Sequence, residues 1–63
     1  NESDWIFNLN QSLDSCNWKS AIFICQHILK NDPTNFNGLF GKALSLYCMS
    51  KYPELEEWMK TLP

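Results

Sequence analysis

The segment from Trp18 to Pro33 restricts the fold of this chain more than any other part of the sequence. Its apolar side chains recur at steps of three and four residues, which places them on one face of an α-helix. The segment ends in Asp32-Pro33, and proline forces the residue before it out of the helical backbone region. We therefore expect a helix over about 18–30. Its apolar face should consist of Trp18, Ala21, Ile22, Cys25, Ile28 and Leu29, and its polar face of Lys19, Gln26, His27 and Lys30.

A segment on each side of this helix has the same periodicity. The one before it, about 3–15, can be capped by Ser3 or Asp4, and its apolar face is Trp5, Leu9, Leu13 and Cys16. The one after it, about 37–50, carries two apolar stripes, so we expect neighbours on two sides of that helix. The stripes are Leu39, Ala43 and Leu46, and Phe40, Leu44 and Tyr47.

A fourth helix is expected over about 53–62. Pro53 suits a first helical turn because it needs no amide donor there, and Glu54, Glu56 and Glu57 lie near the positive end of the helix dipole. Gly38 and Gly41 should weaken the start of the third helix. No segment reads as a strand, so the sequence predicts an all-α fold of antiparallel helix-turn-helix pairs.

The chain partly matches itself at an offset of 34 residues, which aligns Trp18 with Tyr52 and Ala21 with Leu55. A helix-turn-helix period of this length is typical of tetratricopeptide repeats. Trp5, Ala21 and Pro33 stand at the spacings of that family's motif, and the chain resembles the family from about residue 2 to residue 62. The resemblance implies one domain or fragment over 1–63 in a right-handed α-α superhelix. Repeat one would span about 2–35, and repeat two about 36–63 with a degenerate second helix.

Several positions depart from the family motif. Asn8 and Lys42 replace a leucine, Leu9 and Leu55 replace small residues, and Ser12 replaces a tyrosine, whereas Ala43 fits the site where two helices cross closely. Arrays of this kind usually need at least three repeats. Two repeats therefore predict a neighbour: more chain, a second copy or a bound partner.

A narrower resemblance, to the N-terminal repeats of anaphase-promoting complex scaffold subunits, rests on Ala21-Ile22-Phe23, Asn31-Asp32-Pro33 and Leu46-Tyr47-Cys48. In that family, those repeats dimerise.

The side chains with catalytic chemistry do not converge in the predicted helices. His27 is the only histidine and is expected to be exposed on the polar face, whereas Cys25 points elsewhere, so the two cannot form a nucleophile and base pair. The three glutamates after Pro53 are expected to be a solvated helix start. No spacing of metal ligands is present. We therefore expect no enzymatic activity, no cofactor and no metal.

Composition restricts the partners and the compartment. The chain has five lysines, no arginine and a net charge of −2, which disfavours nucleic acid as a partner. No apolar run approaches the length of about 18 residues that a membrane span requires. The three cysteines form no CxxC pair, which favours reduced thiols in an intracellular protein of the cytoplasm or nucleus.

The resemblance also implies a candidate binding groove. Two positions argue against the clamp that some members of the family use for a C-terminal carboxylate: Ile6 replaces its lysine and Leu44 its second asparagine, although Asn10 matches. The groove would instead be lined by Ile6, Asn10, Leu13, Phe40, Leu44 and Tyr47. This mostly apolar set favours an amphipathic helix or apolar peptide as ligand. The alternative is that these side chains pack against a neighbour or against the N-terminus of the chain.

Phe23 stands on the polar face of its helix beside His27, and the two form a candidate second contact face. An aromatic side chain at such a position favours self-association or docking to a scaffold. The sequence thus predicts a non-catalytic protein-protein interaction module, which can also form homo-oligomers. One alternative is a homodimerising scaffold segment of a multi-subunit complex such as a cell-cycle ubiquitin ligase. The other is an accessory domain of a larger enzyme.

Overall fold

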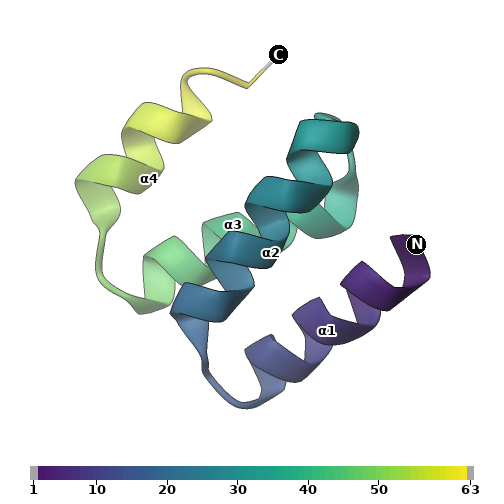
Figure 1. Ribbon diagram of the computed structural model, residues 1–63. Coiled ribbons are helices and arrows are strands. Elements are labelled where there is room, and N and C mark those ends of the chain that lie inside the picture. Colours follow the sequence, from purple (N-terminus) through teal and green to yellow (C-terminus); the bar gives the residue numbers. More distant parts are fainter. Residues whose placement is uncertain (1, 63) are drawn as a thin grey trace.

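Four α-helices make up the computed structural model, which describes the backbone of residues 2–62 and the side chains of residues 3–62 (Figure 1). They are α1 (Glu2–Asp14), α2 (Trp18–Asn31), α3 (Phe36–Cys48) and α4 (Tyr52–Met59). The described part of the chain contains no strand. The predicted all-α fold of four helices joined by short links is therefore confirmed. In Figure 1, α2 and α3 lie between α1 on one side and α4 on the other.

The helix ends differ from the predicted ones for local reasons. Ser3 and Asp4 lie inside α1 instead of capping it. Asn17 caps α2 by accepting a hydrogen bond from the Ser20 amide at 3.4 Å. Asn35 does the same for α3 toward the Gly38 amide at 3.3 Å, and this cap begins the helix at Phe36 instead of Asn37.

The turns that follow α1 and α3 have the same geometry. Cys16 and Ser50, which are 34 residues apart, have positive φ angles of 57° and 60°. After each, the amide donates to a carbonyl five residues back: Asn17 to Ser12 at 2.8 Å, and Lys51 to Leu46 at 2.9 Å. This bond closes the C-terminus of a helix in the Schellman pattern. Cys16 is thus an exposed turn residue, which corrects its expected place on the apolar face of α1.

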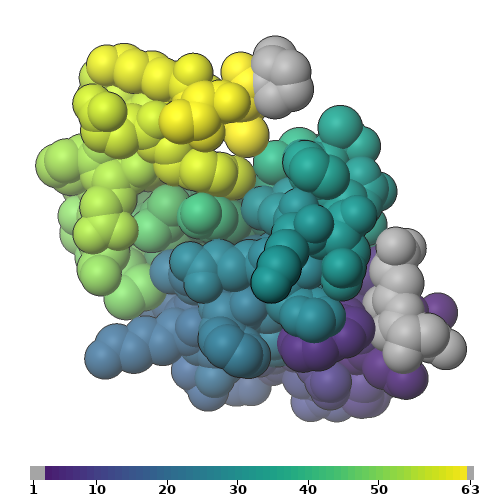
Figure 2. Space-filling view, turned by 45° about the horizontal axis from the view of Figure 1, so that its top comes forward, coloured from purple at the N-terminus to yellow at the C-terminus, as the bar shows by residue number. Residues whose placement is uncertain are grey.

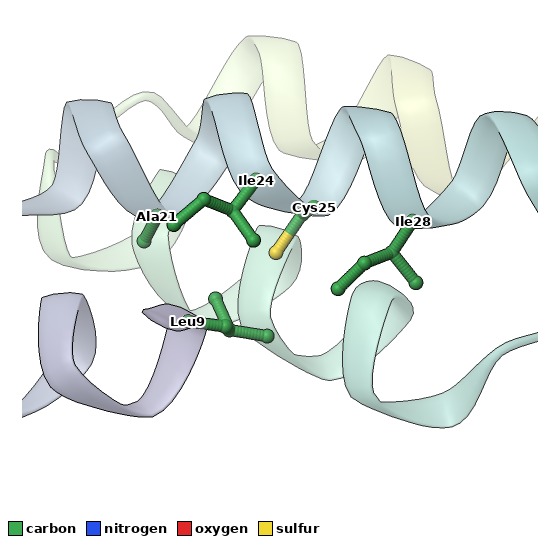
Figure 3. Packing of buried hydrophobic residues seen from close by; sticks show 5 residues of the cluster. All are labelled: Leu9, Ala21, Ile24, Cys25 and Ile28. Atoms are coloured by element: carbon green, nitrogen blue, oxygen red, sulfur yellow. The ribbon is translucent and has the colours of Figure 1, made fainter. Parts of the chain in front are cut away.

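The core cluster is centred on α2 (Figure 3). It consists of Leu9, Ala21, Ile24, Cys25 and Ile28, all buried, with Trp5, Ile6 and Leu13 of α1 packed against it. Ile24 is buried although the predicted apolar face omitted it, whereas Trp18, Ile22 and Leu29 are only half-buried. The reason is that α1 packs on one side of α2 and α3 on the other. The buried face of α2 is therefore rotated about the helix axis relative to the apolar face that the sequence predicted.

The contact between α2 and α3 passes through Gly38, Gly41 and Ser45, all buried. A Cβ atom added at Gly41 would lie 2.7 Å from Cys25 Sγ, so only glycine allows the two helices to approach this closely. Ala43, the expected site of close crossing, is only half-buried. The two glycines, expected only to weaken α3, instead bring it against the core.

Ser45 is the one buried polar side chain of the described core, with an exposed fraction of 0%. Among the described residues, no hydrogen-bond partner reaches its Oγ. A buried hydroxyl without a partner costs about 1–3 kcal/mol. We expect Ser45→Ala to raise the free energy of unfolding by about 1 kcal/mol, measured by urea denaturation, because alanine keeps the side chain small. A loss of stability in this variant would show that the hydroxyl has a partner.

Helix α4 is the least anchored of the four. Its Leu55 and Trp58 are half-buried against α3, and none of its residues is fully buried. Both α2 and α4 are described in full, and no Cα atom of one lies within 8 Å of a Cα atom of the other. Lys51 precedes α4 without a side-chain capping bond, and the helix ends at Met59 rather than near Leu62. A gap between α2 and α4 therefore remains above α3.

Candidate interaction surfaces

An apolar ridge runs along the side of α3 that points away from α2. Phe36, Phe40 and Tyr47 follow each other at helical spacing and are 74%, 53% and 60% exposed. The rings of Phe36 and Phe40 stack with their centroids 5.9 Å apart. At 100° per residue, these side chains point nearly opposite to Ser45, which faces α2. The side of α3 opposite the core is therefore aromatic and open.

The ridge continues onto α4. The ring of Tyr52 meets the ring of Tyr47 edge-on, with 5.6 Å between their centroids. Met59 lies two helical turns after Tyr52 and is 54% exposed. We call these five side chains the apolar ridge: Phe36, Phe40, Tyr47, Tyr52 and Met59.

The six residues of the predicted groove are divided between the core and the surface. Ile6 and Leu13 are half-buried and pack against the core cluster, and Asn10 is exposed. Leu44 is half-buried, so only Phe40 and Tyr47 of this set are large exposed apolar groups.

Sequence reasoning missed Phe36, Tyr52 and Met59 as surface residues. Phe36 lies one residue before the predicted helix start, which concealed its spacing of four residues to Phe40 and eleven to Tyr47. That spacing is the signal that could have revealed the ridge.

His27 is not the exposed polar residue that the sequence predicted. Its ring stacks on Trp5 with centroids 3.8 Å apart and an interplanar angle of 21°, and its Nε2 lies 3.4 Å from Asn31 Nδ2. The histidine thus joins α1 to α2. Phe23, its predicted companion, is 67% exposed.

Cys25 faces the core, away from His27. Burial raises the pKa of its thiol to about 11, and the nearby positive charge of Lys42 only partly offsets this effect. At neutral pH the thiol is therefore protonated and a poor nucleophile. Cys16 and Cys48, in contrast, are exposed. Among the described residues, no three His, Cys, Asp or Glu side chains lie close enough together to hold a metal ion.

A recess of about 500 Å³ lies between α2 and α4, over α3. In Figure 2, a notch separates the yellow α4 from the teal part of the chain. Apolar groups form much of its lining, and the ammonium group of Lys42 stands 4.8 Å above the ring centroid of Trp58. The recess is lined by Ile22, Gln26, Lys42, Leu46, Lys51, Pro53, Glu54, Glu57 and Trp58.

Comparison with known proteins returns no family model, no curated protein and no solved structure that matches this chain. None of the described helices has both the length and the apolar character needed to cross a membrane.

Proposed function

We propose that this chain is a non-catalytic protein-binding module whose apolar ridge receives a helical or apolar segment of a partner. The observation that carries the proposal is the set of five large exposed apolar side chains along one side of α3 and α4, four of which form two ring contacts. Exposed apolar clusters of this kind mark interaction sites in soluble domains. Phe36 alone leaves roughly 150 Å² accessible, and its burial would contribute about 4 kcal/mol before ordering costs.

The charge distribution supports an uncharged partner segment. Between residues 33 and 50 the only charged side chain is Lys42, and it lies over Trp58 on a different side of α3. A charged group facing the α3 part of the ridge would lose hydration without gaining a partner there. On α4, Glu56 lies on the same face as Tyr52 and Met59, so the argument applies to the α3 part alone. The straight row of side chains on α3 suits a second helix, whose own row would pack beside it.

We further propose that the chain is a tetratricopeptide-like fragment of a right-handed superhelix, inside the cell. The turns at Cys16 and Ser50, 34 residues apart and alike in backbone geometry, support a structural repeat of that length. The ridge faces away from the α1–α2 pair, where a further helix pair of an array would stack. A neighbouring repeat is thus one source of the helical segment, and a separate protein is the other.

The test is a selection of helical peptides displayed on phage against the immobilised chain. We expect the selected peptides to carry apolar residues at steps of three and four, and Phe40→Ser to weaken their affinity at least tenfold, or about 1.4 kcal/mol. The affinity is measured by fluorescence anisotropy of labelled peptides. Phe40 is half-exposed, so its replacement should leave the helical circular dichroism signal unchanged.

Phe23→Ser is the matched control for this experiment, because it removes another exposed phenylalanine, from α2 and outside the ridge. We expect it to leave peptide affinity unchanged. Peptides that bind the Phe40→Ser variant as tightly as the original chain would rule out the ridge as the binding site.

A homodimerising scaffold segment is the second candidate function. The specific observation in its favour is the position of Phe23 beside the recess between α2 and α4. An accessory role in a larger enzyme has no such observation behind it.

A further inference from the structure

Phe23 projects from α2 directly beside the recess. Its neighbours in the helix, Ile22 and Gln26, both line the recess, so Phe23 stands at the same level along the α2 axis. It points about 60° away from Gln26 around that axis. With 67% of its surface exposed, it is the largest apolar group on the open side of α2. The exposed Phe23 side chain and the partly apolar recess thus lie next to each other on one face of the molecule.

The recess has the dimensions and chemistry to receive such a side chain. Its volume of about 500 Å³ falls within the range of roughly 300–1,000 Å³ that is usual for ligand pockets. Ile22, Leu46 and Trp58 supply apolar and aromatic surface. Lys42 covers one face of the Trp58 ring. A phenyl ring entering the recess can meet the edge of Trp58, a favoured geometry for aromatic pairs.

The two helices that flank the recess have opposite charge, although the lining itself also contains Lys42 and Lys51. Helix α2 carries Lys19 and Lys30 and no acidic residue, whereas α4 carries three glutamates and no basic residue. Lys19 and Lys30 precede and follow Phe23 by four and seven residues, so they lie on its side of α2. Two of the glutamates, Glu54 and Glu57, line the recess.

The glutamates of α4 that line the recess can exchange their ion-pair partners. Glu54 is paired with Lys51 at 3.9 Å and Glu57 with Lys60 at 3.7 Å. All four side chains are substantially exposed, so these pairs are weak. A lysine from another molecule can replace either local partner with little loss.

We propose that a second copy of this chain docks on this face, with each Phe23 inserted into the recess of the other copy. The two copies are related by a two-fold axis that lies in the interface, between Phe23 and the recess. This rotation places Phe23 of each copy at the recess of the other. The same rotation places α2 of each copy opposite α4 of the other, so basic side chains meet acidic ones twice. Such an isologous contact closes on itself and stops at a dimer.

This face is separate from the apolar ridge. On α4, Glu54 and Glu57 point into the recess, whereas Tyr52 and Met59 point to the opposite side of the helix. A dimer formed through Phe23 therefore leaves both ridges free. One aromatic side chain from each copy gives a reversible contact, smaller than the standard interface of about 800 Å² per partner.

The first test is sedimentation equilibrium of the 63-residue chain over a wide concentration range at low salt. We expect the mass to rise from the monomer value of 7.4 kDa to that of a dimer. Phe23→Ser should weaken dimerisation at least tenfold. The matched control is Phe36→Ser, the same change at an equally exposed ridge position, which should have no effect. A chain that stays monomeric throughout, or a dimer that responds to Phe36→Ser instead, would overturn the proposal.

The second test uses reversal of charge. One variant carries Lys19→Glu and Lys30→Glu, and the other carries Glu54→Lys and Glu57→Lys. In a homodimer of either variant, α2 of each copy would face an α4 of the same charge. Each variant on its own should therefore remain monomeric. Mixed in equal amounts, they should form a heterodimer, because the reversed α2 of one copy then faces the reversed α4 of the other. Failure of the mixture to recover the dimer mass would exclude this arrangement. Binding of helical peptides to the ridge of the Phe23→Ser variant reports on the proposed function independently.

Discussion

Replacing Leu9 by alanine is expected to lower the free energy of unfolding by about 2–5 kcal/mol. Leu9 is 2% exposed and, among the described side chains of α1, is the only fully buried one in the core cluster. Its truncation leaves a cavity where α1, α2 and α3 meet, close to Gly41 and Cys25. A domain of this size has about 3–9 kcal/mol of stability in total, so the variant should be largely unfolded at physiological temperature. Urea denaturation followed by far-ultraviolet circular dichroism measures the loss.

Leu13→Ala provides a matched control for this prediction. It makes the same truncation in the same helix, one turn further on, at a leucine that is only half-buried. The change in helix propensity is equal in the two variants, so any difference reports on burial. We expect Leu13→Ala to cost about 1 kcal/mol. Equal losses would show that Leu9 does not occupy the centre of the core.

Gly41→Ala is expected to lower the free energy of unfolding by about 1–3 kcal/mol. In an exposed helix the same change would raise stability by about 1 kcal/mol, because alanine is the better helix former. Here the added Cβ would lie 2.7 Å from Cys25 Sγ and 3.2 Å from both terminal methyl groups of Leu9. These groups are fully buried and cannot move aside without opening the core. The sign of the effect, measured by thermal and urea unfolding, therefore separates close packing from helix propensity.

A second substitution isolates the contact responsible. Cys25→Ala removes the sulfur atom that the new Cβ would meet, so Gly41→Ala should be less destabilising in the Cys25→Ala background. A double-mutant cycle gives this coupling energy directly. The change Gly38→Ala is a milder comparison, since the closest atoms to its Cβ, at 2.9 Å, would be Cγ and Cδ2 of Leu29, a side chain that is only half-buried. If Gly41→Ala increases stability in both backgrounds, α2 and α3 do not pack as closely at Gly41 as described.

The four helices could be predicted because their signals are local. The apolar period of α2, its Asn17 cap and the Asp32-Pro33 stop all lie within one segment of chain. The start of α3 was misplaced because Asn35, rather than a residue nearer the first apolar stripe, supplies the cap. The turns at Cys16 and Ser50 adopt positive φ without glycine or asparagine. Residue type therefore gave no indication of that geometry.

The candidate surfaces were less predictable than the helices. Two apolar stripes on α3 were recognised, but which of them meets α2 depends on how closely the helices approach. The small residues Gly38, Gly41 and Ser45 make that approach possible and direct the opposite side of α3, with Phe36 and Phe40, outward. The recess beside Phe23 had no signal in the sequence at all, because its lining comes from three helices.

By itself, the sequence determined the helical segments, their order and the oddity of Phe23, since each depends on residues within a few positions of one another. The tertiary structure decided which faces those helices bury. It moved Ile6 and Leu13 into the packing around the core, stacked His27 on Trp5 and kept α4 apart from α2. The physical reason is that burial depends on the distance and rotation between helices. A small side chain at a crossing point sets both, and its effect appears only when the facing helix is in place.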